Sequence, residues 1–147
     1  MNPIPPGIFC VPAIIVGITG ADLESVVYPS LNRNDPRNHE WLHGPVNGVH
    51  THTILKVLEE MGWQVRRYRD RARRSQVMTW AKLSKERWPG EKILLLTNDH
   101  ALAVEDGLVY DTFTPYGGHP ERHSFRKDIV ILAALVRPGP KALGRRA

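Results

Sequence analysis

The chain is 147 residues long, which suits a single domain, and its composition of 41% hydrophobic and 24% charged residues excludes an intrinsically disordered protein. A single cysteine excludes an internal disulfide, so we expect a cytoplasmic protein rather than a secreted one. The formal net charge of +5 favours acidic partners only in a general way.

The N-terminal third predicts helices and a loop. An apolar run that includes Pro12 predicts a buried helix over residues 12–19, because proline is favoured in the first turn of a helix. The run is too short to span a bilayer and no Lys or Arg precedes it, so we expect neither a membrane segment nor a signal peptide. Asp22 predicts the N-cap of a second short helix that ends near Pro29. Residues 32–48, rich in Asn, Pro, Gly and His, predict a long surface loop.

The middle third predicts two longer helices with a strand between them. An apolar stripe that begins at Ile54 indicates an amphipathic helix, which Gly62 ends. Residues 63–69 alternate in the manner of a strand. Ser75 predicts the N-cap of the next helix, which Pro89 terminates.

The last third changes to the patterns of strands. Four strands are predicted, over residues 93–97, 100–105, 108–113 and 129–136. Asp106 and Gly107 supply a tight hairpin turn between the middle two. Helices that precede an antiparallel sheet define the α+β class. We therefore predict one domain over residues 1–137, followed by a flexible basic tail over residues 138–147.

Cys10 is the first residue that could carry chemistry. It lies two residues before Pro12, at or beside the N-cap of the first predicted helix. Free backbone N–H groups and the positive end of the helix dipole meet there, and both lower the pKa of a thiol. The alternative is that Cys10 is a small buried apolar residue within an apolar run.

His100 and Asp111 are predicted to meet across the hairpin. A two-residue turn pairs Leu102 with Asp111, which makes His100 and Asp111 diagonal neighbours on one face, with Cβ atoms about 7 Å apart. One extra loop residue would move Asp111 to the opposite face. The competing carboxylates rank lower, because Asp99 points to the other side of its strand and Asp106 sits in the turn.

The order Cys10, His100, Asp111, and the segment HALAVEDGLVYD that joins the last two, resemble the papain-like cysteine peptidases. They are most similar to the bacteriocin-processing peptidases of ABC exporters and their bacterial and phage relatives. The resemblance implies N-terminal helices packed on a C-terminal antiparallel β-sheet, with the active-site cleft between them. It implies a bacterial or phage thiol hydrolase that acts on a peptide or protein amide without a cofactor or metal.

The implied mechanism uses a Cys-His-Asp triad and an acyl-enzyme. His100 takes the proton of Cys10, the thiolate attacks a carbonyl carbon, and Asp111 fixes the tautomer of the imidazole. Relatives usually place a glutamine several residues before the cysteine to complete the oxyanion hole, whereas no glutamine precedes Cys10. Asn2 is the one upstream amide side chain, so it and backbone N–H groups near Cys10 are the possible donors.

Three other interpretations remain open. The first is a catalytically inactive papain-like protein that serves as a binding module. The second is a nucleic-acid-binding protein, with Tyr68 or Trp63 stacking on bases beside a basic run. That run contains Arg66, Arg67, Arg69, Arg71, Arg73 and Arg74. The third is a zinc site, for which clustered imidazoles could serve as ligands. The cluster contains His39, His43, His50 and His52.

Overall fold

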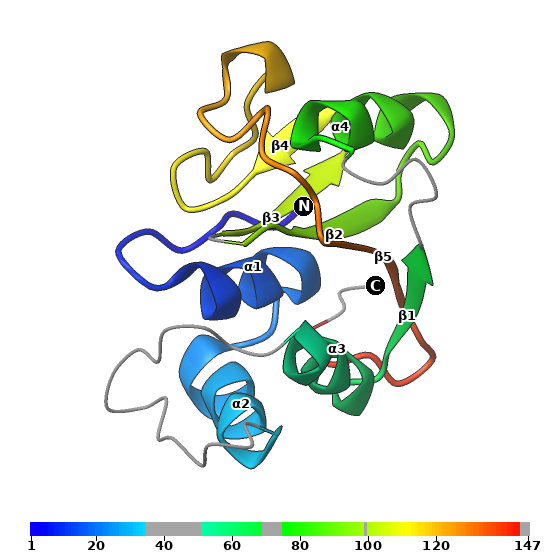
Figure 1. The fold of residues 1–147 in the computed structure, drawn as a ribbon. Helices are drawn as coiled ribbons and strands as arrows, with labels where there is room; N and C mark the ends of the chain where they lie inside the picture. The colour runs from blue at the N-terminus through cyan, green and yellow to red at the C-terminus, as the bar shows by residue number, and fades with distance from the viewer. Residues whose placement is uncertain (35–50, 69–74, 99, 145–147) are drawn as a thin grey trace.

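The fold is given by a computed structural model, which describes residues 1–34, 51–68, 75–98 and 100–144. Its centre is a five-stranded antiparallel sheet with strand order β1-β5-β2-β3-β4 (Figure 1). The strands are β1 (Trp63–Tyr68), β2 (Lys92–Leu96), β3 (Ala101–Glu105), β4 (Leu108–Tyr110) and β5 (Leu132–Pro138). This arrangement confirms the predicted α+β class.

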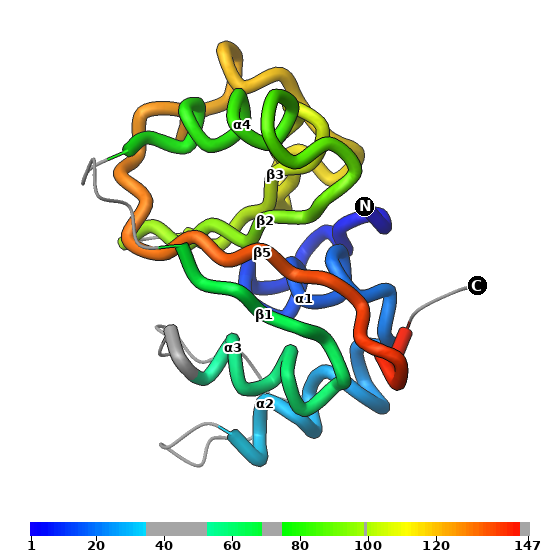
Figure 2. Tube along the Cα trace, turned by 90° about the vertical axis from the view of Figure 1, so that its right-hand side faces the viewer, coloured from blue at the N-terminus to red at the C-terminus, as the bar shows by residue number. Residues whose placement is uncertain are grey.

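Helices cover both faces of the sheet. The helices on one face are α1 (Cys10–Thr19), α2 (Tyr28–Asn34) and α3 (Thr51–Glu60), and α4 (Val77–Glu86) lies on the other (Figure 2). A π-helical turn, η1 (Leu23–Val27), joins α1 to α2, and a 3-10 turn, η3 (Pro120–Arg122), precedes β5. Because both faces are covered, the central strands are apolar along most of their length.

Strand β3 divides its side chains between the two hydrophobic cores. Ala101 and Ala103 belong to the core beneath α1, while Leu102 and Val104 belong to the core beneath α4. The alternation follows from the two-residue period of a strand. Because the side chains beneath α1 are small, that helix can approach the sheet closely.

The first helices differ in detail from the prediction. Helix α1 begins at Cys10, two residues earlier than expected, with Phe9 at its N-cap. Asp22 caps the next turn as predicted, accepting a hydrogen bond from the backbone N–H of Ser25 at 2.9 Å. The predicted end near Pro29 is wrong, since Pro29 lies in the first turn of α2, where a missing N–H costs nothing. The first three residues of the predicted loop 32–48 belong to α2, and 35–48 lie outside the described residues.

The predicted cap of α4 is also wrong. Gln76, not Ser75, holds the N-cap position, and its side chain makes no capping hydrogen bond. Instead the backbone N–H groups of Val77 and Met78 donate to the carbonyls of Asp128 and Arg126, both at 3.0 Å. Carbonyl groups from a distant loop therefore satisfy the free N–H groups of this helix, a non-local solution that the local sequence does not encode.

The strands agree with the prediction except at their ends. The predicted strand 108–113 ends at Tyr110, because the next residues form a turn in which the N–H of Thr114 donates to the carbonyl of Asp111 at 3.2 Å. The predicted strand 129–136 is displaced to 132–138. Strand β1 ends at Tyr68, and residue 69 lies outside the described residues.

The segment after β5 returns to the junction between α3 and β1. The N–H of Leu143 donates to the carbonyl of Met61 at 2.7 Å, and Leu143 in turn accepts from the indole N–H of Trp63 at 2.9 Å. The predicted boundary between a domain over 1–137 and a tail over 138–147 stays a prediction.

Within the described ranges, no single helix is long and apolar enough to cross a bilayer. Helix α1 and the stretch Leu23–Asn34 satisfy that criterion only when taken together, across a bend of 110°. That criterion considers only length and composition.

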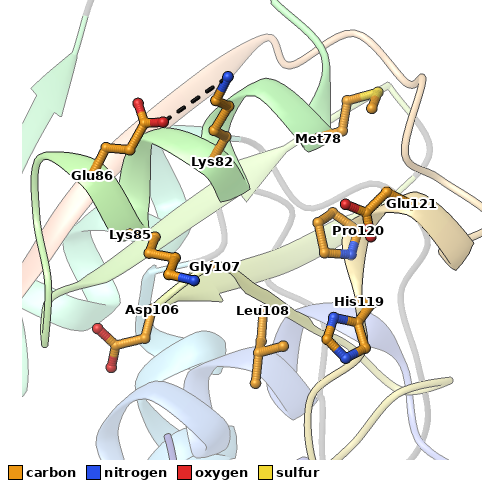
Figure 3. A pocket seen from close by; sticks show the side chains of 10 residues that line it. All are labelled: Met78, Lys82, Lys85, Glu86, Asp106, Gly107, Leu108, His119, Pro120 and Glu121. Atoms are coloured by element: carbon orange, nitrogen blue, oxygen red, sulfur yellow. Dashed lines mark ion pairs between the residues drawn. The ribbon is translucent and has the colours of Figure 1, made fainter.

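An open cavity of about 450 Å³ lies between α4, the β3–β4 turn and η3 (Figure 3). It is lined by charged residues of both signs, including Lys85, Asp106 and Glu121. Cys10, His100 and Asp111 are not among its lining residues. The cavity is therefore separate from the predicted catalytic residues.

Gly107 is expected to set the stability of the β3–β4 hairpin. Asp106 and Gly107 have φ values of 50° and 85°, in the left-handed region that two-residue hairpin turns require. Replacing Gly107 by alanine should lower the free energy of unfolding by about 1–2 kcal/mol, measured by urea denaturation. Asp106→Asn is the matched control, because asparagine tolerates this conformation. Equal stability of Gly107→Ala and the wild type would contradict this account of the turn.

Candidate active site

Cys10 occupies the first turn of α1 and is partly buried. Burial by itself raises the pKa of the thiol. Hydrogen bonds from the His100 side chain and the backbone N–H of Ala101, together with the positive charge of His100, outweigh burial, so the pKa of Cys10 lies below its ordinary value. The thiolate is thus stabilised chiefly by groups at and just before the start of β3.

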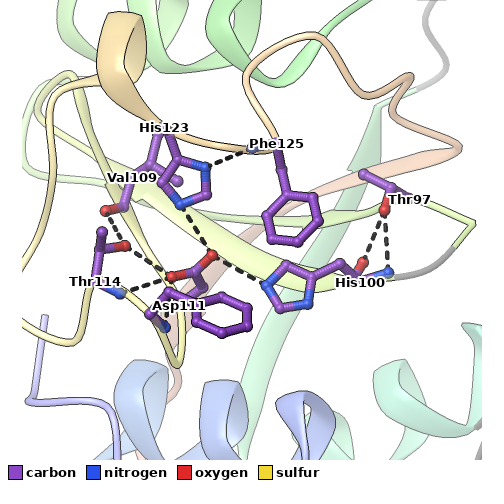
Figure 4. A network of polar contacts seen from close by, with 8 residues as sticks. Thr97, His100, Val109, Asp111, Thr114, His123 and Phe125 are labelled. Atoms are coloured by element: carbon purple, nitrogen blue, oxygen red, sulfur yellow. Dashed lines mark hydrogen bonds and ion pairs between the residues drawn. The ribbon is translucent and has the colours of Figure 1, made fainter.

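His100 lies just before β3, in a turn that fixes its backbone. Its N–H donates to the Thr97 hydroxyl at 3.1 Å, and its carbonyl accepts from the N–H of Thr97 at 2.9 Å. The imidazole Nε2 lies 3.0 Å from Oδ2 of Asp111 (Figure 4). Burial alone would lower the pKa of His100, but hydrogen bonds to Asp111 and Cys10, with their negative charges, raise it to about 9.

Asp111 is a buried carboxylate surrounded by donors. Its Oδ1 accepts from the N–H of Phe113 at 2.9 Å, and from the N–H and hydroxyl of Thr114, both at 2.8 Å. Its Oδ2 faces His100 and, at 2.9 Å, Nε2 of His123 (Figure 4). Burial raises the pKa of Asp111, but the hydrogen bonds outweigh it and hold the pKa well below its usual range.

The hairpin register is as predicted where the ladder exists. Glu105 pairs with Leu108, and Ala103 with Tyr110. The expected pairing of Leu102 with Asp111 is not formed, because the ladder ends at Tyr110 and Asp111 begins the turn that Thr114 closes. The turn nevertheless leaves the Asp111 carboxylate within hydrogen-bond distance of His100.

Exposed aromatic residues lie beside Cys10 and His100. Phe9, the residue before Cys10, is 44% exposed, and Phe113, whose ring centroid lies 5.9 Å from that of His100, is 73% exposed. The His100 ring is itself almost covered, at 7% exposure. Cys10 is thus partly exposed, whereas the imidazole beside it is enclosed.

Asn2 is placed elsewhere. Its side-chain amide donates to the carbonyl of Gly17 at 3.2 Å, near the C-terminal end of α1. Gly17 lies about 10 Å along the helix axis from Cys10, at 1.5 Å per residue. The structure therefore does not bring Asn2 to the thiol.

The competing carboxylates and the residues of the alternative sites either have other partners or lie outside the described residues. Asp106 accepts from the N–H of Gly90 at 2.7 Å, and Asp99 lies outside the described residues. Arg66 lies over the Tyr68 ring, 5.5 Å from its centroid, and that ring also packs against Trp88 at 5.0 Å. The described ranges do not include Arg69, Arg71, Arg73, Arg74, His39, His43 and His50, nor the side chain of His52.

Sequence reasoning missed the contribution of residues 123–125. His123 contacts Asp111, and the ring of Phe125 stacks on that of His100, with centroids 4.4 Å apart and an interplanar angle of 26°. These residues come from an irregular segment well beyond the hairpin. No periodicity or spacing connects them to the site, so the sequence carries no local signal for the contact.

The α+β fold of this chain is similar to that of a solved peptidase domain. The chain is similar in structure to the peptidase domain of Streptococcus ComA, a bi-functional ABC transporter involved in a quorum sensing pathway. The TM-score is 0.58, with 13% sequence identity, over 94% of this chain and 99% of that one. At this identity the likeness shows the fold. No family model and no curated protein matches the sequence.

The elevated pKa of His100 is expected to depend on both of its acidic neighbours. Cys10→Ala and Asp111→Asn each remove a negative charge beside the ring, which disfavours the imidazolium, so each should lower the pKa of His100 below about 9. The measurement is an NMR titration of the His100 ring protons. An unchanged midpoint in both variants would show that the three groups are not coupled.

Proposed function

We propose that the protein is a cysteine peptidase, or a closely related thiol amide hydrolase, in which Cys10 is the nucleophile, His100 the general base and Asp111 the residue that orients the base. The observation that carries the proposal is the contact of one imidazole with both other groups. The His100 side chain hydrogen-bonds with Cys10, and its Nε2 lies 3.0 Å from Oδ2 of Asp111. These are the nucleophile, base and orienter that thiol catalysis requires.

The reaction begins with the proton of Cys10 on His100. The thiolate attacks the carbonyl carbon of a peptide bond, the electron pair of the carbonyl moves to oxygen, and a tetrahedral intermediate forms. His100 then donates its proton to the leaving amine as the C–N bond breaks. A water molecule loses a proton to His100, attacks the thioester and releases the acid, which restores the thiol–imidazole pair.

Backbone groups supply the oxyanion hole in this proposal. The first N–H groups of a helix have no partners within the helix, and Cys10 lies in the first turn of α1. Pro12 has no N–H, so the first turn offers the backbone N–H groups of Cys10 and Val11 as donors. A hole with few donors predicts modest turnover, because removing one donor costs about 100-fold or more in rate.

The likeness to a peptidase domain supports a peptide substrate. The nucleic-acid alternative gains no support from Tyr68, whose ring already packs against Trp80 and Trp88. The inactive binding module remains the competing proposal, and reactivity and turnover together distinguish the two.

The first test is alkylation of the single thiol by iodoacetamide near pH 6, followed by mass spectrometry. A thiolate stabilised by His100 should react at least about tenfold faster in the wild type than in His100→Ala, since an unassisted thiol is almost fully protonated at this pH. His119→Ala is the matched control, because His119 is an exposed imidazole outside the site. An inert wild-type thiol, or equal rates in wild type and His100→Ala, would refute the proposal.

The second test is cleavage of a complex peptide pool, read by mass spectrometry of new termini. The wild type is expected to produce new termini and Cys10→Ala none, because the acyl-enzyme cannot form without the sulfur. A reactive thiol with no cleavage of any peptide would favour the inactive binding module.

A further inference from the structure

Asp111 contacts a second imidazole that the triad does not require. His123 Nε2 lies 2.9 Å from Oδ2 of Asp111, the same oxygen that faces His100 (Figure 4). The His123 side chain is 2% exposed. Among the described residues, this nitrogen makes no hydrogen bond of good geometry to any group. Because a buried N–H without an acceptor is costly, we take Oδ2 of Asp111, 2.9 Å away, as the acceptor of this N–H.

The backbone of Phe125 fixes the tautomer of His123. Its N–H donates to Nδ1 of His123 at 3.1 Å. A ring nitrogen that accepts a hydrogen bond carries no proton, so in a neutral ring the proton is on Nε2. His123 is therefore arranged to present an N–H to Asp111 without bringing a positive charge into the core.

The surroundings of His123 are otherwise ordered by backbone contacts. Its own N–H donates to the carbonyl of Pro120 at 3.2 Å, and its carbonyl accepts from the N–H of Arg126 at 3.2 Å. The guanidinium of Arg126 donates to the same carbonyl at 3.1 Å and not to the ring. Among the described residues, the charged or titratable groups that contact His123 are therefore the Asp111 carboxylate, which also contacts His100, and the Arg126 guanidinium, which contacts the His123 carbonyl.

We propose that His123 is a positioning residue that keeps Asp111 ionised and aimed at His100. The inference rests on the proposed function and deepens it. Oδ1 is held by the 111–114 turn, so the carboxylate cannot rotate freely, and the N–H of His123 stabilises the negative charge on Oδ2. A more stable carboxylate favours the imidazolium form of His100, which in turn favours the Cys10 thiolate.

Phe125 contacts both His123 and His100. Its N–H holds the His123 ring, and its own ring stacks on that of His100 at 4.4 Å. One short segment, residues 123–125, therefore orients both the carboxylate and the base. The histidine is separated from the sulfur by two intervening side chains, so it acts through them rather than on a substrate.

The test is the pH profile of Cys10 alkylation in two variants. His123→Phe keeps a ring of similar size but removes the donor, while His123→Gln places an amide N–H where Nε2 stood. The acid limb of the profile should move to higher pH by about one unit in His123→Phe, a tenfold lower rate at pH 6. It should stay near the wild-type position in His123→Gln, and the exposed control His119→Phe should not move it.

The outcomes separate this inference from the proposed function. An inert thiol in the wild type refutes the proposed function itself. A reactive wild-type thiol with a folded His123→Phe of unchanged profile overturns only the role of His123, as does a His123→Gln profile shifted as far as that of His123→Phe.

A measurement on the wild type keeps the inference testable if His123→Phe does not fold. Spectra of ¹⁵N-histidine protein at neutral pH distinguish the two neutral tautomers of each ring. Finding the proton of His123 on Nε2, with Nδ1 unprotonated, supports the role. Finding it on Nδ1 overturns the role, because Nε2 would then have no proton to donate to Asp111.

Discussion

The site depends on how the buried carboxylate of Asp111 is compensated. A carboxylate removed from water is unstable unless donors replace the lost hydration. Here three hydrogen bonds from the 111–114 turn meet one oxygen, and two imidazoles meet the other. The donors come from three separate local structures, so the single charge fixes the end of β4, the ring of His100 and the segment that carries His123. Neutralising Asp111 would release all three at once.

The second constraint is the distance between Cys10 and His100, which come from different layers of the fold. Cys10 begins α1, whereas His100 precedes β3, and the two elements meet through the core beneath α1. The small side chains of Ala101 and Ala103 let the helix lie close to the strand. Larger residues at either position would lift α1 away from the sheet and the sulfur away from the imidazole. The geometry of the site is therefore a property of the core.

Local signals in the sequence were enough to predict the class of fold and the proximity of His100 and Asp111. The Asp106–Gly107 turn determines the hairpin register, and the turn that begins at Asp111, directly after the ladder, leaves its carboxylate beside His100. The prediction failed where the determining contact is non-local. The cap of α4 comes from carbonyls at residues 126 and 128, and the end of β4 follows from the donors that Asp111 collects. His123 reaches the site from an irregular segment, and no pattern of spacing marks it. Asn2 is an upstream amide and so a candidate from the sequence, but its side chain donates to the carbonyl of Gly17.

The carbonyl caps of α4 connect the two sides of the sheet. The loop that supplies them, at Arg126 and Asp128, continues directly from Phe125 and His123. Fraying of the first turn of α4 would therefore loosen the attachment of that loop. Under the proposed role of His123, the free energy of opening this helix end also affects the ionisation of the thiol on the opposite face of the sheet. Amide exchange at Val77 and Met78 would report on that linkage from a position remote from the sulfur.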